Sequence, residues 1–215
     1  MKKKTKVIFT EVCLPLVLNE ETELTGNNCG PLSILMLIMT DFKDMIKNFK
    51  LEKIIRMVKK EGKESTMPGF MCQCLLRLGY TVQYFSKIDW QKCTVDPETS
   101  LNEWDPVVQQ LAKVPWFNTT KLQKSAIWLT ESAQKDIVVK QELTIDDLIQ
   151  FLKDKKRVIT IVDQGRHYVV VTGINVESVH FNDPNTGTNR SMDHRHFKYY
   201  WGNAQGFSEA IVAKI

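Results

Sequence analysis

The residue with the clearest chemical potential in the sequence is Cys29, which lies where a polar, turn-forming stretch gives way to an apolar one. Asn27 and Asn28 end the polar stretch, and the apolar run Leu32–Met39 follows. This change predicts a buried helix that begins near Cys29, with Pro31 in the first turn, where a missing N–H costs nothing. The dipole and free N–H groups of a helix N-terminus favour a thiolate. Cys29 is therefore a candidate nucleophile.

A thiol nucleophile needs a base, and four histidines are available. His167 begins the apolar run Tyr168–Val171, so we expect its ring to project from a strand end towards a cleft. His180 alternates with apolar neighbours and is expected on the opposite side of its strand. His194 and His196 lie two residues apart in a polar segment that reads as a solvated loop, without a third residue that would complete a metal site. His167 is the favoured base, and no metal is expected.

An imidazole base also needs a group that orients its second nitrogen. We expect a hairpin that runs from His167 through a turn at Gly173 and brings the chain back at Asp183. Its carboxylate would then lie beside the His167 ring. Pro184 keeps Asp183 out of helical geometry and helps to fix the turn. The sequence leaves open the alternative that this segment is only a turn.

The elements that must position these residues are helices in the first part of the chain and strands in the last. The expected helices are Pro31–Met39, two within Asp41–Lys60, one from Pro68 to Gly79 capped by Thr66, Pro106–Leu111, and one capped by Thr144 that runs to Leu152. The expected strands are Lys6–Glu11, Thr81–Phe85, Val158–Val162, His167–Thr172, Val176–Phe181 and Gly206–Ile215. This order predicts an α+β fold.

The domain organisation follows from this order and from the chain length of 215 residues. We expect a single domain, residues 1–215, with a helical lobe at about 1–155 and a β-sheet lobe at about 156–215. The pattern is weakest over Asp89–Gln134, which reads as an insertion within one fold. The tryptophans there are expected to pack in the interior, with a role in lining a substrate groove as the alternative.

Composition narrows the classes of function. The net charge of +4 is modest and its one dense lysine run, Lys2–Lys4, is terminal, so nucleic-acid binding is not expected. Five irregularly spaced cysteines do not form a disulfide framework, and Cys72 and Cys74 are expected in the core. No run reaches the roughly 20 apolar residues of a membrane span, and Glu11 interrupts the only stretch that resembles a signal peptide. We expect a cytoplasmic location.

Three motifs together resemble the bacteriocin-processing peptidases, papain-like cysteine peptidases that cut leader peptides after a double glycine, and their stand-alone relatives. The motifs are Asn28–Pro31, His167–Gly173 and Asn182–Gly187. The resemblance implies a papain-like α+β fold in which the nucleophile helix packs on a C-terminal antiparallel sheet. It also implies that Cys29 is the nucleophile, His167 the general base and Asp183 its orienting group, acting on a polypeptide substrate without a cofactor.

The oxyanion hole is where the sequence departs from this family. The family usually has a glutamine six residues before the cysteine, and here that position is Glu23. A carboxylate repels a developing negative charge, and loss of one good donor costs about 10²–10³ in rate. The remaining amide candidates are Asn19, Asn27 and Asn28, and the Cys29 backbone N–H supplies one donor.

These observations predict a cysteine-dependent hydrolase that acts on amide bonds, most simply a peptidase working through an acyl-enzyme. Two alternatives stay open. The same three residues serve a glutamine deamidase or an acyl-transferase, because specificity depends on the groove rather than on the fold. A catalytically inactive, peptide-binding relative is the other alternative, and Glu23 favours it. Substrate identity and oligomeric state do not follow from the sequence.

Overall fold

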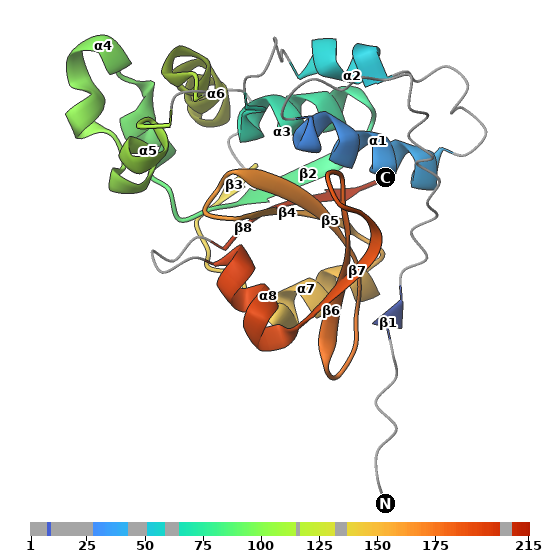
Figure 1. Cartoon of the computed structure of the whole chain (residues 1–215). Coiled ribbons are helices and arrows are strands. Elements are labelled where there is room, and N and C mark those ends of the chain that lie inside the picture. Colours follow the sequence, from blue (N-terminus) through green and yellow to red (C-terminus); the bar gives the residue numbers. More distant parts are fainter. Residues whose placement is uncertain are drawn as a thin grey trace, which may run out of the picture.

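The computed structural model describes residues 8–9, 28–42, 51–58, 65–114, 117–131, 137–202 and 208–215. Its centre is one twisted sheet (Figure 1). Along the sheet the strands are β3 (Val138–Val139), β2 (Thr81–Phe85), β8 (Glu209–Lys214), β4 (Arg157–Val162), β5 (His167–Ile174), β6 (Ser178–Asp183) and β7 (Gly187–Asp193), and β1 (Ile8–Phe9) pairs with β5. Neighbouring strands are antiparallel except β2 and β3, which are parallel.

Helices cover both faces of the sheet (Figure 1). On one side lie α1 (Cys29–Asp41), α2 (Leu51–Met57), α3 (Pro68–Arg77) and α6 (Thr119–Glu131), and on the other lie α7 (Ile145–Lys153) and α8 (His194–Trp201). The shorter elements η2 (Trp90–Thr94), α4 (Pro97–Ser100), η3 (Leu101–Glu103) and α5 (Pro106–Leu111) gather with α6 at one end of the molecule. None of the helices in the described ranges is both long and apolar enough to cross a bilayer.

The two faces of the sheet bury separate cores because side chains alternate along each strand. In β4, Ile159 and Ile161 belong to the core beneath α1 and α3, whereas Val158 and Val162 belong to the core beneath α7 and α8. Strands β5 and β8 alternate in the same way. Such near-continuous apolar strands are typical of a sheet covered on both sides.

The helix that carries Cys29 is buried all round, as its sequence predicts. Every residue from Cys29 to Ile38 is buried, and α1 packs against β5. Gly30 allows the close approach to the segment before α3, since a Cβ atom at this position would lie 2.8 Å from the Cβ atom of Thr66 and 2.9 Å from Met71 Sδ. This packing fixes the first turn of α1, and with it Cys29, against the rest of the molecule.

The predicted α+β fold class is confirmed, with α1 packed on an antiparallel part of the sheet. The helices at 106–111 and 145–153 begin where expected, and Thr144 and Asp147 form a reciprocal capping box. Cys72 and Cys74 lie in the core as expected. The sheet also includes β2 and β3 from the first 155 residues, so strands occur on both sides of the expected lobe boundary.

Several local predictions were wrong. Met67, not Thr66, is the N-cap residue of α3, and it makes no side-chain capping bond. Strand β5 continues through Gly173, because the turn is formed by Asn175, whose side chain accepts hydrogen bonds from the two backbone N–H groups of Glu177 and Ser178. His194 and His196 lie in helix α8 rather than in a loop. Helix α6 and strand β7 had not been predicted.

Candidate active site

His167 and Asp183 meet at the site that the sequence predicted. They lie on adjacent antiparallel strands, β5 and β6, and His167 Nε2 is 2.8 Å from Asp183 Oδ1. Both side chains are nearly enclosed, with 11% and 8% of their surface exposed. The hairpin therefore brings the two residues together across 16 residues of chain, although its turn lies later than expected.

The carboxylate of Asp183 is held by its own turn. Its Oδ1 accepts a hydrogen bond of 2.8 Å from the Asn185 backbone N–H, and its Oδ2 accepts one of 2.8 Å from the Thr186 hydroxyl. Burial alone would raise the pKa of Asp183, but hydrogen bonds from His167, Asn185 and Thr186 lower it to about 2. A carboxylate that is ionised at neutral pH can only accept, so the Nε2 atom of His167 carries the proton of this bond.

The second ring nitrogen of His167, Nδ1, is then left for Cys29. Burial alone would lower the pKa of His167, but hydrogen bonds with Asp183 and with Cys29 and the charges of these two residues raise it to about 9. Cys29 is the first residue of α1 and is 5% exposed. The structure thus brings a thiol, an imidazole and a carboxylate together in series from α1, β5 and β6.

Among the four candidates for the oxyanion hole, only Asn28 lies within the described residues; Asn19, Glu23 and Asn27 lie outside them. Asn28 is buried at 6% exposure, immediately before α1. Its carbonyl accepts a 2.9 Å hydrogen bond from the Leu32 N–H, and its side chain does not cap the helix. The N–H groups of the first helical turn lack intrahelical partners, which adds backbone donors next to the sulfur.

The other histidines make contacts elsewhere. His180 Nε2 lies 2.9 Å from Asn175 Nδ2, on the strand face opposite to Val179 and Phe181, as predicted. His194 Nε2 lies 2.9 Å from the Asn175 carbonyl. His196 contacts Asp193, the N-cap residue of its own helix. Over the described ranges, no group of three or more His, Cys, Asp or Glu side chains is arranged to hold a metal ion.

The remaining described cysteines differ from Cys29 in their surroundings. Burial raises the pKa of the Cys72 thiol, and it raises those of Cys74 and Cys93 to about 12 and about 11. All three have no exposed surface, whereas Cys29 lies at the edge of the same core with 5% of its surface exposed. A thiol without exposed surface is unreactive at neutral pH, but Cys29 borders a pocket.

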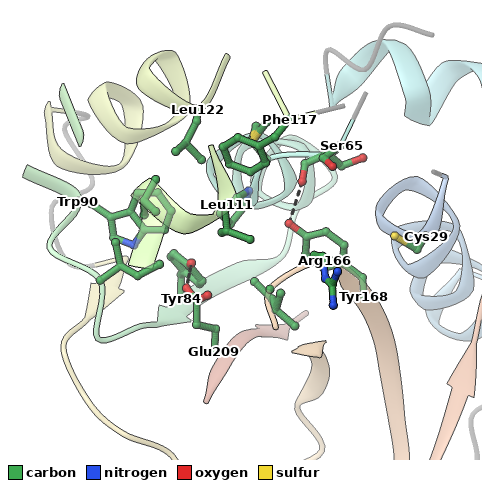
Figure 2. Close-up of a pocket in the computed structure, with 17 residues that line it drawn as sticks. Cys29, Ser65, Tyr84, Trp90, Leu111, Phe117, Leu122, Arg166, Tyr168 and Glu209 are labelled. Atoms are coloured by element: carbon green, nitrogen blue, oxygen red, sulfur yellow. Dashed lines mark hydrogen bonds between the residues drawn. The ribbon is translucent and has the colours of Figure 1, made fainter. Parts of the chain in front are cut away.

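This pocket corresponds only to the alternative expectation, in which tryptophans of the Asp89–Gln134 segment line a substrate groove. The space not filled by atoms there amounts to about 530 Å³, a value that includes open solvent, and Cys29 forms one side (Figure 2). Its walls are mostly apolar and aromatic, and include Trp90, Phe117, Leu122 and Tyr168. Tyr168 is tied to the opposite wall by a 2.9 Å hydrogen bond from its hydroxyl to the Thr66 carbonyl. The expectation that the tryptophans are interior residues holds for Trp90, which is 3% exposed and also lines the pocket.

Glu209 lines the pocket but was not among the predicted site residues. It is the first residue of β8, within a strand that is otherwise apolar up to Ala213. A charged residue inside a buried strand was the available signal, because glutamate is rarely fully buried without a partner or a function.

The fold and the cluster define a class: an α+β protein with a buried cysteine–histidine–carboxylate series beside a pocket. The chain belongs to the Peptidase_C39 like family, whose model matches residues 80–209 and which confirms the resemblance read from the sequence. The matched range includes His167 and Asp183 and begins after Cys29.

One solved structure gives further context. The peptidase domain of Streptococcus ComA, a bifunctional ABC transporter involved in a quorum-sensing pathway, is 16% identical to the chain. The match covers 88% of this chain and 93% of that one, with a TM-score of 0.45. No curated protein matches the chain.

Proposed function

We propose that the protein is a cysteine peptidase in which Cys29, His167 and Asp183 act together on a peptide bond. The observation that carries this proposal is the buried series from the Cys29 thiol through the His167 ring to the Asp183 carboxylate. Membership of a peptidase-like family supports the same class of reaction. Cys29 lines the pocket, whereas burial raises the pKa values of the Cys72, Cys74 and Cys93 thiols, and this difference supports its choice as the nucleophile.

At the start of the proposed reaction the Cys29 thiol proton already lies on His167 Nδ1, because the pKa of His167 is raised to about 9 and the ring is protonated at neutral pH. The thiolate attacks the substrate carbonyl carbon, and the electron pair of the C=O bond moves onto oxygen. When the intermediate collapses, the C–N bond breaks and the leaving amine takes the proton from the imidazolium. Water, deprotonated by His167, then attacks the thioester and releases the acid and the free thiol. Throughout, Asp183 accepts from Nε2–H and stabilises the imidazolium.

The oxyanion would be stabilised by the Cys29 backbone N–H together with the Asn28 side-chain amide. Asn28 is adjacent to the nucleophile, and its side chain is not used to cap α1. Because each donor of an oxyanion hole contributes about 10²–10³ in rate, Asn28→Ala should lower kcat by that factor.

We also propose that residues 1–215 form one domain that binds a polypeptide substrate. Its support is that the site draws α1 from the first part of the chain and β5 and β6 from the last part, and that α1 packs directly on β5. The pocket likewise takes its walls from both parts.

The test uses a proteome-derived peptide library, with new N-termini identified by mass spectrometry. Wild-type protein should produce backbone cuts, and Cys29→Ala should produce none. Cys93→Ala, at another buried cysteine, is the matched control and should retain the cuts. A gain of about one dalton without a new N-terminus would replace the proposal by glutamine deamidation, since loss of NH₃ and gain of water changes a side chain only. Full cleavage by Cys29→Ala would overturn it.

A measurement without substrate completes the test. Iodoacetamide at neutral pH should alkylate Cys29 faster than the three buried thiols, and His167→Ala should remove this advantage by leaving the thiol without its base. Equal and slow alkylation of all described cysteines would contradict an activated nucleophile.

A further inference from the structure

Glu209 places a carboxylate at the base of the pocket that Cys29 borders (Figure 2). Only 4% of the residue is exposed, although it lines the pocket. Its backbone is fixed by strand pairing with Ile161 and by a 2.9 Å hydrogen bond from Trp201 Nε1 to its carbonyl. The side chain is therefore held in a set position beneath the pocket.

Among the described residues, both donors to this carboxylate reach the same oxygen. Oε1 accepts from the Tyr84 hydroxyl and, at 2.7 Å, from the Ser86 hydroxyl. The Ser86 oxygen itself accepts from the Ile88 backbone N–H at 3.1 Å and from Trp90 Nε1 at 3.3 Å, so its own proton is directed at Glu209. Two donors aligned in this way hold Oε1 in place.

The second oxygen, Oε2, accepts no hydrogen bond from the described residues. This oxygen is also not fully enclosed, since it is absent from the set of enclosed polar atoms that lack a partner in the described part of the chain. Because Glu209 lines the pocket, Oε2 faces the pocket space. A buried carboxylate oxygen without a donor is costly, and a cationic donor is the partner that compensates for it most fully. A cationic group that enters the pocket would supply this partner.

The pocket walls fit the stem of a long basic side chain. Above Glu209 they are formed by aromatic and aliphatic groups, among them Tyr84, Trp90, Leu122 and Tyr168. Lysine and arginine pack their methylene groups along apolar surfaces while the charged end finds a polar partner. Aromatic faces add a favourable interaction with the cation.

We propose that this pocket receives a lysine or arginine side chain of the polypeptide substrate, with Glu209 as the residue that selects it. The inference rests on the proposed peptidase function and names the substrate class for the same site.

The neighbouring charges are compatible with a cationic ligand. Arg166 also lines the pocket, but its guanidinium is paired with Asp163, 3.3 Å from its Oδ1 and 3.1 Å from its carbonyl oxygen. Asp105, the N-cap residue of α5, adds negative charge near Glu209. Because Arg166 is paired with Asp163, it does not supply the donor that Glu209 Oε2 lacks. The charge of Asp105 strengthens the preference of the pocket for a cation.

The preference should depend on pH. Burial raises the pKa of Glu209 to about 7 against the hydrogen bonds from Tyr84 and Ser86, and the charge of Asp105 raises it further. The titratable or charged groups around Glu209 and its pocket are Tyr84 on β2, Asp105 before α5, Arg166 before β5, Tyr168 on β5 and Cys29 on α1. The carboxyl gains its charge as pH rises through about 7, so selectivity for a cation should grow between pH 6 and pH 8.

The test measures binding by calorimetry to the Cys29→Ala protein, which removes any need for turnover. The probes are Nα-benzoyl-arginine amide and Nα-benzoyl-citrulline amide, which have nearly the same shape and differ in charge. We expect the arginine probe to bind roughly tenfold more tightly at pH 8, as for a hydrogen bond to a charged group. Glu209→Gln should abolish the difference, while Glu177→Gln, at an exposed carboxylate outside the pocket, should preserve it.

Each outcome decides the proposal. Equal binding of the two probes by Cys29→Ala, or an arginine preference that survives Glu209→Gln, overturns it. If Glu209→Gln does not fold, the pH series on Cys29→Ala decides, because a preference that does not grow from pH 6 to pH 8 contradicts Glu209 as its source. Absence of peptide cleavage by the wild-type protein would overturn the proposed function alone, since the binding result is obtained without catalysis.

Discussion

Two histidine–aspartate pairs occur among the described residues, and they differ in position, exposure and partners. His167 and Asp183 come from two adjacent strands, and their side chains are 11% and 8% exposed. His196 and Asp193 belong to the first turn of α8 and its N-cap, and their side chains are 76% and 55% exposed. The buried pair contacts the Cys29 thiol, whereas the exposed pair closes the start of a helix.

The different surroundings of the two pairs show why only the buried pair is a candidate for catalysis. In the exposed pair, the Asp193 carboxylate accepts from the His196 backbone N–H and ring, which lowers its pKa and serves to cap the helix. Water screens this contact. In the buried pair, each partner shifts the pKa of the other, and the second nitrogen of the His167 ring, Nδ1, is the one available to the Cys29 thiol. Burial and the third partner, rather than the pairing itself, distinguish the two.

The largest expected effect contrasts the two histidines. His167→Ala should lower kcat/KM for peptide cleavage by about 10³-fold or more, because it removes the base and the group that protonates the leaving amine. His196→Ala removes a histidine with the same type of partner and should leave kcat/KM within about twofold, since surface changes have little effect. Initial-rate assays on one cleaved peptide check both.

Two outcomes of the same assay would contradict the proposed difference between the buried and the exposed pair. A His196→Ala protein that loses activity as severely as His167→Ala would place the exposed pair in the reaction. A His167→Ala protein with wild-type kcat/KM would remove the buried pair from it. Melting curves of both variants establish that any loss of rate is not a loss of folded protein.

A smaller effect is expected at the two aspartates. Asp183→Asn should lower kcat/KM by about 10²-fold, because a neutral amide stabilises the imidazolium less than a carboxylate does and can present its NH₂ group to the ring. Since the Asp183 bond and charge help to raise the pKa of His167 to about 9, the fall in rate at alkaline pH should move to lower pH in this variant. The measurement is the pH profile of kcat/KM from pH 5 to pH 10.

Asp193→Asn is the matched control for this profile, because it alters the other carboxylate without touching the site. It should keep both the rate and the alkaline limb of the wild type. An unshifted alkaline limb in Asp183→Asn would show that Asp183 does not set the protonation of His167, even if the rate fell for structural reasons.

The two pairs also illustrate which features could be predicted from the sequence and which could not. His167 and Asp183 were found because each ends or begins an apolar strand, a pattern that survives in the sequence as alternation and as a turn signal. That His194 and His196 begin a helix was missed, because the short helix buries only Phe197 and Trp201 among polar neighbours. Helix α6 was missed for a similar reason, since its buried residues are few and include Ser125.

The site itself was predictable only where it is local. The helix start at Cys29 and the strand end at His167 can be recognised from the residues that flank them. These two local patterns are enough to suggest a cysteine–histidine pair. The pocket is not local, because Tyr84, Trp90 and Glu209 come from β2, η2 and β8 and meet only through the strand order β2-β8-β4. Glu209 acquires its importance from donors more than 100 residues away in the chain, at Tyr84 and Ser86.

The smallest expected effect concerns stability and separates the pairs without any substrate. The pKa of His167 is raised from 6.5 to about 9 on folding, so its contribution to stability is fully present below pH 6.5 and is lost as pH rises through about 9. The pKa of Asp183 is lowered from 3.8 to about 2, so its contribution is present above pH 3.8 and is lost as pH falls through about 2. Urea unfolding under reducing conditions should therefore show the free energy of unfolding of the wild type falling between pH 6.5 and pH 9 relative to His167→Gln.

The control is His196→Gln. The difference in free energy of unfolding between the wild type and this variant should stay nearly constant over the same pH range, because His196 and Asp193 are exposed and screened by water. A flat difference for His167→Gln over this range would mean that the buried pair couples no more strongly to folding than the exposed one.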